Sequence, residues 1–136
     1  MFTPTTNAEQ TVKDFFQAIG TQDWEAARAL LAEDVVWTVM ARGVPGAGAH
    51  HGADAIFDFI RPVRALFAAG SPQMTLRCLI SAGPMVVMEA HGGGQLKDGR
   101  AYDNHYAMVI DVRNGKVSAL REYMDSYYVH ELLGHG

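Results

Sequence analysis

The sequence contains one cysteine, few basic residues and no long apolar run. Cys78 alone can form neither an internal disulfide nor a thiolate metal cluster. The 11 Lys and Arg residues are scattered and are outnumbered by 15 Asp and Glu, which gives a formal net charge of -4. Because phosphate binding needs a basic footprint, no nucleic-acid partner is expected. No apolar stretch is long enough to span a bilayer, so no membrane partner is expected either.

The first residues lack the basic, apolar and small-residue pattern of a secretory signal, so we expect a soluble, cytoplasmic protein. Repeats, linkers and low-complexity tracts are also missing. Hydrophobic residues make up 49% of the chain, as in ordinary globular proteins. A chain of 136 residues can bury one core but not two. The sequence therefore predicts a single domain over residues 1–136.

Helical periodicity dominates the first half of the chain. The expected helices cover 7–19, 24–33 and 53–67. Asp23 can cap the second helix, and Pro62 should kink or split the third. Between the second and third of these helices, β-branched residues predict a strand at 35–40. A mobile glycine-rich loop should follow this strand.

Strand patterns dominate from residue 74 onward, with strands expected at 74–81 and 85–91. Asn114-Gly115, between two apolar runs, is a strong hairpin signal. It should join a strand ending at 113 to one that runs from 116 to about 128, before a short tail. Helices followed by antiparallel strands predict an α+β domain. We expect a cone-shaped, curved antiparallel sheet wrapped around three N-terminal helices, with an internal hydrophobic pocket.

The register of this hairpin decides which side chains face the pocket. A two-residue turn would place Glu122 opposite Ala107, whereas a three-residue loop with a glycine bulge would place it opposite Tyr106. We favour the second register, because it sets polar groups into a mostly apolar face, as in a ligand pocket. That face would carry Tyr102, Asn104, Tyr106, Met108, Ile110, Leu120, Glu122 and Met124.

A second turn brings another polar residue to this face. With a two-residue turn at Asp98-Gly99, His91 lies opposite Tyr106. His91, Tyr106 and Glu122 would then form one polar line across three strands, because neighbouring strands lie about 4.8 Å apart. Asn104 and Glu89 would flank this line.

The polar line of His91, Tyr106 and Glu122 predicts acid–base catalysis. Burial raises the pKa of a carboxyl, which suits Glu122 to proton transfer near neutral pH. Tyr106, His91 and Asn104 would polarise or orient a substrate. The alternative is that Glu122 is a buried structural acid. The further residues expected to line the pocket are Phe15, Ile19, Trp37, Phe59, Val63, Glu89, Met108, Leu120 and Met124.

The histidines do not predict a metal site. His50 and His51 are adjacent and would point in opposite directions in an extended segment. No spacing among His91, His105 and His130 matches a metal-binding motif. We therefore expect no metal and no cofactor.

The convex face of the sheet should be an interface. It would carry Ala107, Val109, Ala119, Tyr123 and His105, a set too apolar to face water. This predicts a homodimer that forms through the convex face.

Three segments resemble the SnoaL-like branch of the nuclear transport factor 2-like superfamily. They are LLAEDVVW at 30–37, DGRAYDNHY at 98–106 and NGKVSALREYMD at 114–125. With the order of elements, the resemblance covers nearly the whole chain and implies the cone fold. Ketosteroid isomerases and limonene epoxide hydrolases belong to this superfamily. In these relatives the acid of the last strand points into the cone, which implies an inward Glu122.

The catalytic residues of the relatives match this chain only in part. The three working positions of ketosteroid isomerase align with the apolar residues Phe15, Val39 and Met108. The Asp-Arg-Asp set of the epoxide hydrolase aligns with Glu122, Glu89 and His91, and its tyrosine and asparagine with Trp37 and Val39. In SnoaL-like polyketide cyclases the acid that matches Glu122 transfers the proton, and only this position is retained.

Two functions remain open at this point. The first is cofactor-free acid–base catalysis of an isomerase, cyclase, dehydratase or hydrolase type on a small, largely apolar molecule. The second is a non-catalytic module that binds a small hydrophobic ligand or only supports dimerisation. This fold hosts both classes, so the fold by itself does not choose between them.

Overall fold

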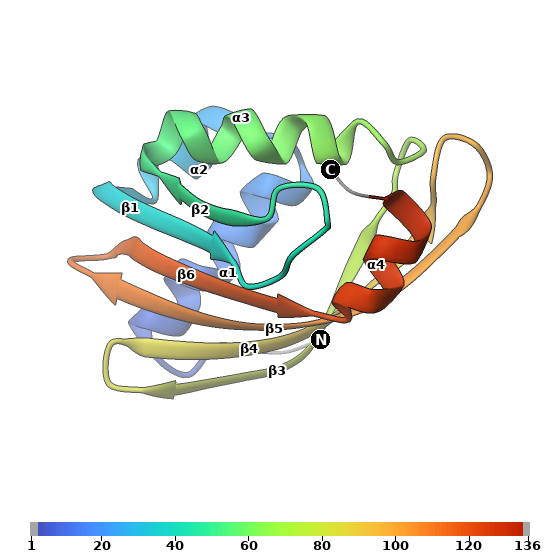
Figure 1. Cartoon of the computed structure of the whole chain (residues 1–136). Helices are drawn as coiled ribbons and strands as arrows, with labels where there is room; N and C mark the ends of the chain where they lie inside the picture. Colours follow the sequence, from blue (N-terminus) through green and yellow to red (C-terminus); the bar gives the residue numbers. More distant parts are fainter. Residues whose placement is uncertain (1–2, 135–136) are drawn as a thin grey trace.

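The computed structural model describes residues 3–134, which form four helices and six strands (Figure 1). The helices are α1 (Asn7–Gly20), α2 (Trp24–Ala29), α3 (Gly52–Arg64) and α4 (Ser126–Leu133). The strands are β1 (Leu31–Val39), β2 (Gly48–His51), β3 (Gln73–Ala82), β4 (Met85–Gln95), β5 (Ala101–Arg113) and β6 (Lys116–Met124). The expected α+β class is confirmed, and α4 is an addition to the three expected helices.

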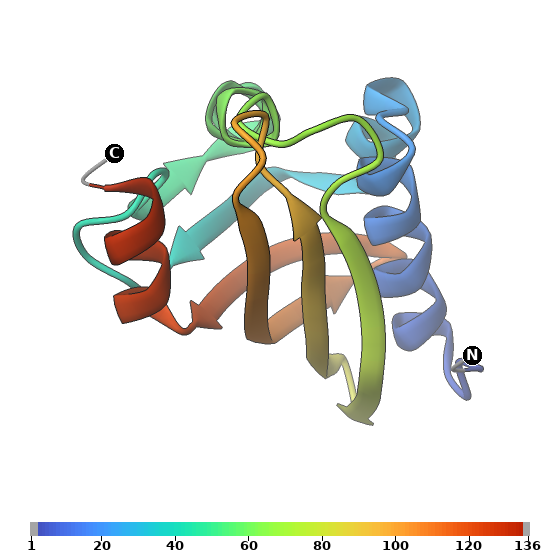
Figure 2. The same cartoon turned by 90° about the vertical axis from the view of Figure 1, so that its right-hand side faces the viewer.

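The strands form one curled sheet that does not close on itself. Their order is β2-β1-β6-β5-β4-β3. The β1–β6 pair is parallel and the other neighbours are antiparallel. On the concave side, α1 packs across β3 to β6 and α3 packs on β1 and β2. Figure 2 shows α4 on the opposite side of the molecule from α1.

Three of the helices begin at a capping side chain. Thr6, Asp23 and Asp125 each accept a hydrogen bond of 3.1 Å from the backbone N–H three residues further along. The expected cap at Asp23 is thereby confirmed. The cap at Asp125 ends β6 and starts α4, so the expectation of a longer last strand and a tail was wrong.

Two helices differ from what the sequence predicts. The second helix ends at Ala29 because the chain then pairs with β6, where Val117 N donates to Leu30 O at 2.7 Å. Tertiary pairing here overrides local helix propensity. The third helix runs through Pro62 without splitting. Pro62 lies two residues before the end of the helix, so the hydrogen bond that its missing N–H would make to Asp58 is lost only in the last turn.

The β5–β6 hairpin has a two-residue turn with positive φ at both Asn114 and Gly115 (53° and 73°), which is a type I′ turn. A bulge after Val117 then shifts the pairing, so that Glu122 lies opposite Met108. Neither of the two expected registers was correct. The favoured one was wrong by two residues, and a shift of two keeps every side chain on its expected face.

The β4–β5 turn contains three residues, 97–99, where two were expected. Leu96 N donates to Arg100 O at 2.9 Å. The extra residue moves each β4 side chain to the face opposite the expected one. Ala90 therefore lies inward opposite Tyr106, and His91 pairs with His105 on the outer face. The expected line of His91, Tyr106 and Glu122 does not form.

The core lies between the concave face and the helices α1 and α3. Its largest fully buried side chains are Phe15, Phe57, Ile56, Ile110 and Leu120. Among residues 3–134, no helix combines the length and the apolar character needed to cross a membrane.

Candidate functional site

Glu122 is a buried acid on the inner face of β6. It is 8% exposed, and its Oε1 accepts a hydrogen bond from Trp37 Nε1 at 2.9 Å. Oε2 has no hydrogen-bond partner among the described residues. The Trp37 ring is held by contacts with the rings of Phe15, Phe16 and Phe59. The carboxyl therefore has one fixed donor and one oxygen left to interact with a ligand.

Burial raises the pKa of Glu122 to about 7, and the hydrogen bond from Trp37 opposes this rise. Removing a carboxylate from water disfavours its charged form, while a donor favours it. Near neutral pH the acid and the carboxylate are then present in similar amounts. Such a group can both accept and return a proton.

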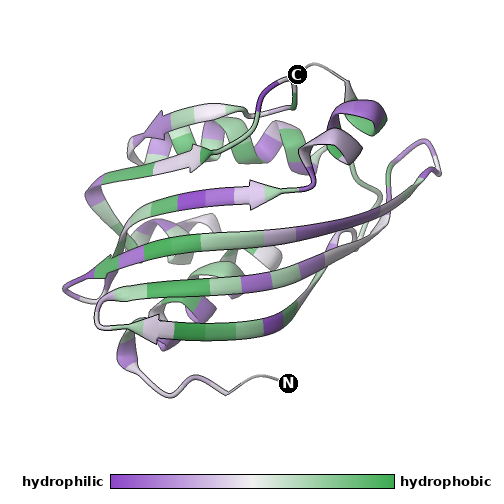
Figure 3. Ribbon diagram, turned by 60° about the horizontal axis from the view of Figure 1, so that its bottom comes forward, coloured by the Kyte–Doolittle hydropathy of each residue, from purple (hydrophilic) through white to green (hydrophobic). Residues whose placement is uncertain are grey.

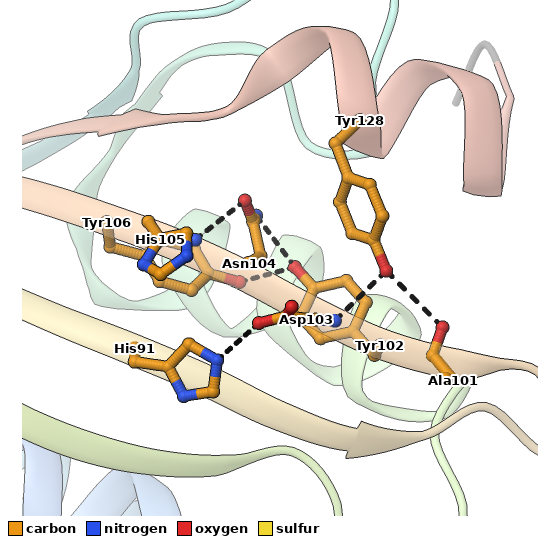
Figure 4. A network of polar contacts seen from close by, with 8 residues as sticks. All are labelled: His91, Ala101, Tyr102, Asp103, Asn104, His105, Tyr106 and Tyr128. Atoms are coloured by element: carbon orange, nitrogen blue, oxygen red, sulfur yellow. Dashed lines mark hydrogen bonds and ion pairs between the residues drawn. The ribbon is translucent and has the colours of Figure 1, made fainter.

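A chain of hydrogen bonds runs along the inner face of β5 (Figure 4). The backbone N–H of His105 donates to Asn104 Oδ1 at 2.9 Å, so the amide Nδ2 is left to donate to the Tyr102 hydroxyl at 3.0 Å. The hydroxyls of Tyr102 and Tyr106 are 2.5 Å apart. Since Tyr102 accepts from Asn104, it can donate its own proton to Tyr106. This order leaves the Tyr106 O–H as a donor for a ligand.

Tyr106 and Glu122 share the inner face as diagonal neighbours. Glu122 pairs with Met108, and Tyr106 lies two residues before Met108 on β5. Diagonal neighbours on adjacent strands lie about 7–8 Å apart, a gap that a small ligand group can bridge. Burial raises the pKa of Tyr106 well above its usual range, so its hydroxyl stays protonated and donates.

Gly92 makes room for this phenol. A Cβ atom on Gly92 would lie 2.9 Å from Cε2 of Tyr106 and 3.1 Å from the sulfur of Met74. Only a residue without a side chain lets the tyrosine ring lie over β4 at this point. The glycine run at 92–94 therefore shapes the site, and β4 continues through it to Gln95.

A cavity of about 1220 Å³ opens between α1, the end of α3 and the β3 edge of the sheet. Its inner wall is apolar and includes Phe16, Ile19, Leu79, Met88 and Ala90. The pocket was expected around Glu122. The cavity instead lies nearer α1 and β3, and Glu122 does not line it.

The charged side chains that line the cavity are basic. Lys13, Arg61, Arg64 and Lys97 line it, and no Asp or Glu is among the described lining residues. The Nε of Arg64 is buried and has no hydrogen-bond partner within residues 3–134. Arg61 lies over the rings of Trp24 and Phe57 at 5.2 and 5.6 Å. In a chain with more acids than bases, this arrangement favours a negatively charged ligand group.

A thin layer of side chains separates the cavity from Glu122. Across the sheet, Glu122 pairs with Met108 and Met108 pairs with Met88, which lines the cavity. On the helix side, Phe16 lines the cavity and its ring contacts Trp37 at 6.0 Å. Methionine side chains are flexible and repack readily. Met88 and Met108 therefore lie between the cavity and the acid.

The structure brings together only part of the expected catalytic set. Glu122, Tyr106 and Asn104 lie on the inner face as expected. His91 and Glu89 were expected there and lie on the outer face, because of the longer β4–β5 turn. His105 faces outward, as expected.

The expected pocket-lining residues are dispersed. Ile19 lies in the cavity wall. Phe59 stacks on His50, with ring centroids 4.0 Å apart, and Val63 packs beside Phe67. The others are inner-face or core residues around Glu122, with Met124 half-buried opposite Tyr106; they are Phe15, Trp37, Met108, Leu120 and Met124.

Sequence reasoning missed the basic residues of the cavity. Their positions along the chain carry no common motif, because they come from α1, α3 and the β4–β5 turn. Only Arg61 and Arg64, spaced three apart on α3, gave a local signal that they share one helix side.

Comparison with known proteins identifies close structural relatives. A family model for the SnoaL-like domain matches residues 12–120. An NTF2-like protein from Burkholderia xenovorans is 26% identical, with a TM-score of 0.78 and 98% coverage of both chains. Another from Burkholderia thailandensis is also 26% identical, with a TM-score of 0.81 over 93% of this chain and 96% of that one.

A third structure is TerC, co-crystallised with polyporic acid. It is 19% identical, with a TM-score of 0.80 over 94% of this chain and 98% of that chain. At this identity the match concerns the fold alone. The search of curated protein sequences finds no match. The resemblance that the sequence motifs suggested is confirmed by the family model and the structures.

The raised pKa of Glu122 predicts a pH-dependent stability. The folded state binds this proton more tightly than the unfolded state, so the stabilisation is present below about pH 4.5 and is lost as the pH rises through about 7. Relative to the Glu122→Gln variant, the unfolding free energy of the native chain should fall by roughly 3 kcal/mol across this range. Urea unfolding of both chains at several pH values measures it. A difference that does not vary with pH would contradict the prediction.

Proposed function

The chain belongs to the SnoaL-like domain family, and from this premise we propose that it is an acid–base enzyme acting on a small, largely apolar molecule. The observation that carries the proposal is the buried Glu122 carboxyl, placed diagonally to the Tyr106 hydroxyl on the inner face. The reaction would be of an isomerase, cyclase, dehydratase or hydrolase type, with protein side chains moving the proton.

Each side chain has a defined task in this proposal. The Glu122 carboxylate takes a proton from a carbon next to a substrate carbonyl, and the electron pair moves to the carbonyl oxygen. Tyr106 donates a hydrogen bond to that oxygen and stabilises its negative charge. The protonated Glu122 then returns the proton to another carbon. Trp37 holds the carboxyl through Oε1, and Asn104 and Tyr102 orient the Tyr106 proton.

The basic residues of the cavity support a substrate with an acidic group. An apolar body would pack against Met88 and Phe16, while its anionic group would meet Arg64 and Arg61. Arg64 Nε lacks a partner among the described residues, and an anion would satisfy it. TerC, which has the same fold, was crystallised with an organic acid.

A second function is favoured by a different observation. Glu122 does not line the cavity and is separated from it by Met88 and Met108. If these side chains stay in place, the cavity binds an apolar anion and no chemistry follows. The protein would then be a binding module of the same fold.

The outer face of the sheet supports the proposal of a homodimer. Ile80, Val87 and Tyr123 are 60%, 37% and 42% exposed there. Figure 3 shows the residues of both faces together, with hydrophobic ones along one half of β3, β4 and β5; Ile80 and Val87 are the exposed, outward members of that half. A second copy that covers the apolar half would remove these side chains from water.

Proton exchange tests the enzymatic proposal. In deuterated water, the native chain should catalyse exchange of the protons next to the carbonyl in a panel of apolar keto acids, followed by NMR. Glu122→Gln should lower the exchange rate by about 10²–10⁴-fold, because the base is lost. Glu89→Gln, which changes an acid of the outer face, should not alter it.

Binding of a fluorescent apolar anion separates the two functions. Glu122→Gln should still bind anilinonaphthalene sulfonate as the native chain does. If the native chain binds this probe but exchanges no protons in any keto acid, the binding module is the correct function.

Arg64 should determine the preference for an anion. Arg64→Met should weaken anilinonaphthalene sulfonate binding by about tenfold or more, since a charge-assisted hydrogen bond contributes about 1.5–3 kcal/mol. Phenylnaphthylamine, which is the same probe without its sulfonate, should bind the native chain and Arg64→Met equally. Arg113→Met is the control, because Arg113 pairs with Asp34 outside the cavity. Equal losses for both ligands would show that only packing had changed.

Sedimentation tests the homodimer. The native chain should sediment as a dimer at micromolar concentration, and Val87→Asp should shift it to a monomer by placing a charge in the apolar half of the outer face. Tyr127→Asp is the control, because Tyr127 is exposed on α4 and not on the sheet. A native monomer at micromolar concentration would end this proposal.

A further inference from the structure

Two imidazoles and a carboxylate converge on the outer face of the sheet. Asp103 and His105 are two residues apart on β5, so they point to the same face. His91 on β4 pairs directly with His105. Figure 4 shows the three side chains together, and alternation along β5 puts Asp103 and His105 on the face opposite the tyrosines. None of the three takes part in the proposed acid–base chemistry.

The three groups lie within reach of one ion. His91 Nε2 and Asp103 Oδ1 are 2.5 Å apart, and the rings of His91 and His105 have centroids 5.1 Å apart. One potential ligand atom from each residue lies within 4.8 Å of the other two. The distances required around Zn²⁺ are about 2.0–2.2 Å from each ligand. The Asp103 side chain is 70% exposed, so little packing opposes the rotation that such distances require.

Gly93 allows His91 to lean toward Asp103. Gly93 pairs with Asp103 across the strands, and a Cβ atom on it would lie 2.9 Å from Cε1 of His91. The imidazole thus occupies the space that any other residue at this position would fill. Gly93 thus lets the His91 ring lie against β4 beside Asp103.

We propose that His91, Asp103 and His105 bind a divalent transition-metal ion such as Zn²⁺ on the outer face of the sheet. Two imidazoles and one carboxylate are ligands that suit Zn²⁺ and Co²⁺. Three protein ligands leave at least one coordination position open.

The charged neighbours do not prevent binding. Arg77 and Glu89 line the same outer hollow as His105, and their charges are opposite. Neither charge is among the three ligand groups, which come from His91, Asp103 and His105. In the structure, His91 and Asp103 are joined by a hydrogen bond between Nε2 and Oδ1.

Calorimetric titration of the chain, free of any affinity tag, with Zn²⁺ tests the proposal. We expect saturable binding of one ion per chain, reversed by a chelator. His91→Asn, Asp103→Asn and His105→Asn should each weaken the affinity by more than about tenfold, since even outer-shell partners of a metal contribute 10–100-fold. Gly93→Ala keeps all three ligands but displaces the His91 ring, and it should also weaken binding by about tenfold.

The matched control is His51→Asn, which removes an exposed histidine of β2 and should leave the affinity unchanged. A measurement on the native chain needs no variant. Co²⁺ should shift the imidazole NMR signals of His91 and His105 and leave that of His51 in place. The proposal is overturned if the native chain shows no saturable binding, or if His51→Asn lowers the affinity as much as the ligand variants do.

Discussion

Alternation of side chains along β5 is the constraint on which both faces of this sheet depend. Tyr102, Asn104 and Tyr106 point into the cone, and the residues between them, Asp103 and His105, point out. One strand thus supplies a phenol donor chain to the interior and two potential metal ligands to the exterior. A slip of one residue would exchange the two sets and place the carboxyl of Asp103 in the core. The type I′ turn and the bulge of the hairpin prevent that slip, because they set the pairing of β5 with β6.

Inside the cone, the burial of Glu122 destabilises the fold but favours proton transfer. A carboxyl in an apolar environment with one hydrogen bond is costly to ionise. The fold tolerates this because the surrounding core is large and because the proton can stay bound near neutral pH. Trp37 limits the cost by donating to Oε1, and its own ring is fixed by three phenylalanines. The same burial that weakens the fold gives the acid a pKa suited to proton transfer.

The opening of the cavity and its basic side chains come from different parts of the chain. The open side of the cone lies between α1 and β3, where the apolar wall meets basic residues from α3 and the β4–β5 turn. The glycines of β4 allow this side to form. Gly92 leaves room for Tyr106, and Gly94 lets the turn before β3 approach, since a Cβ atom there would lie 2.4 Å from the Ser71 hydroxyl. The glycine run at 92–94 lets neighbouring groups pack closely against β4.

The sequence by itself determined the α+β class, the helix at Asp23, the Asn114-Gly115 hairpin and the inward face of β5 and β6, because these depend on local periodicity and turn chemistry. It did not determine the pairing of β4 with β5. One additional residue in the 97–99 turn moved His91 and Glu89 to the outer face, and no local pattern distinguishes a two-residue from a three-residue turn there. The end of α2 and the basic cavity likewise depended on contacts between segments far apart in the chain. These contacts form only because the curled sheet brings α1, α3 and β3 together.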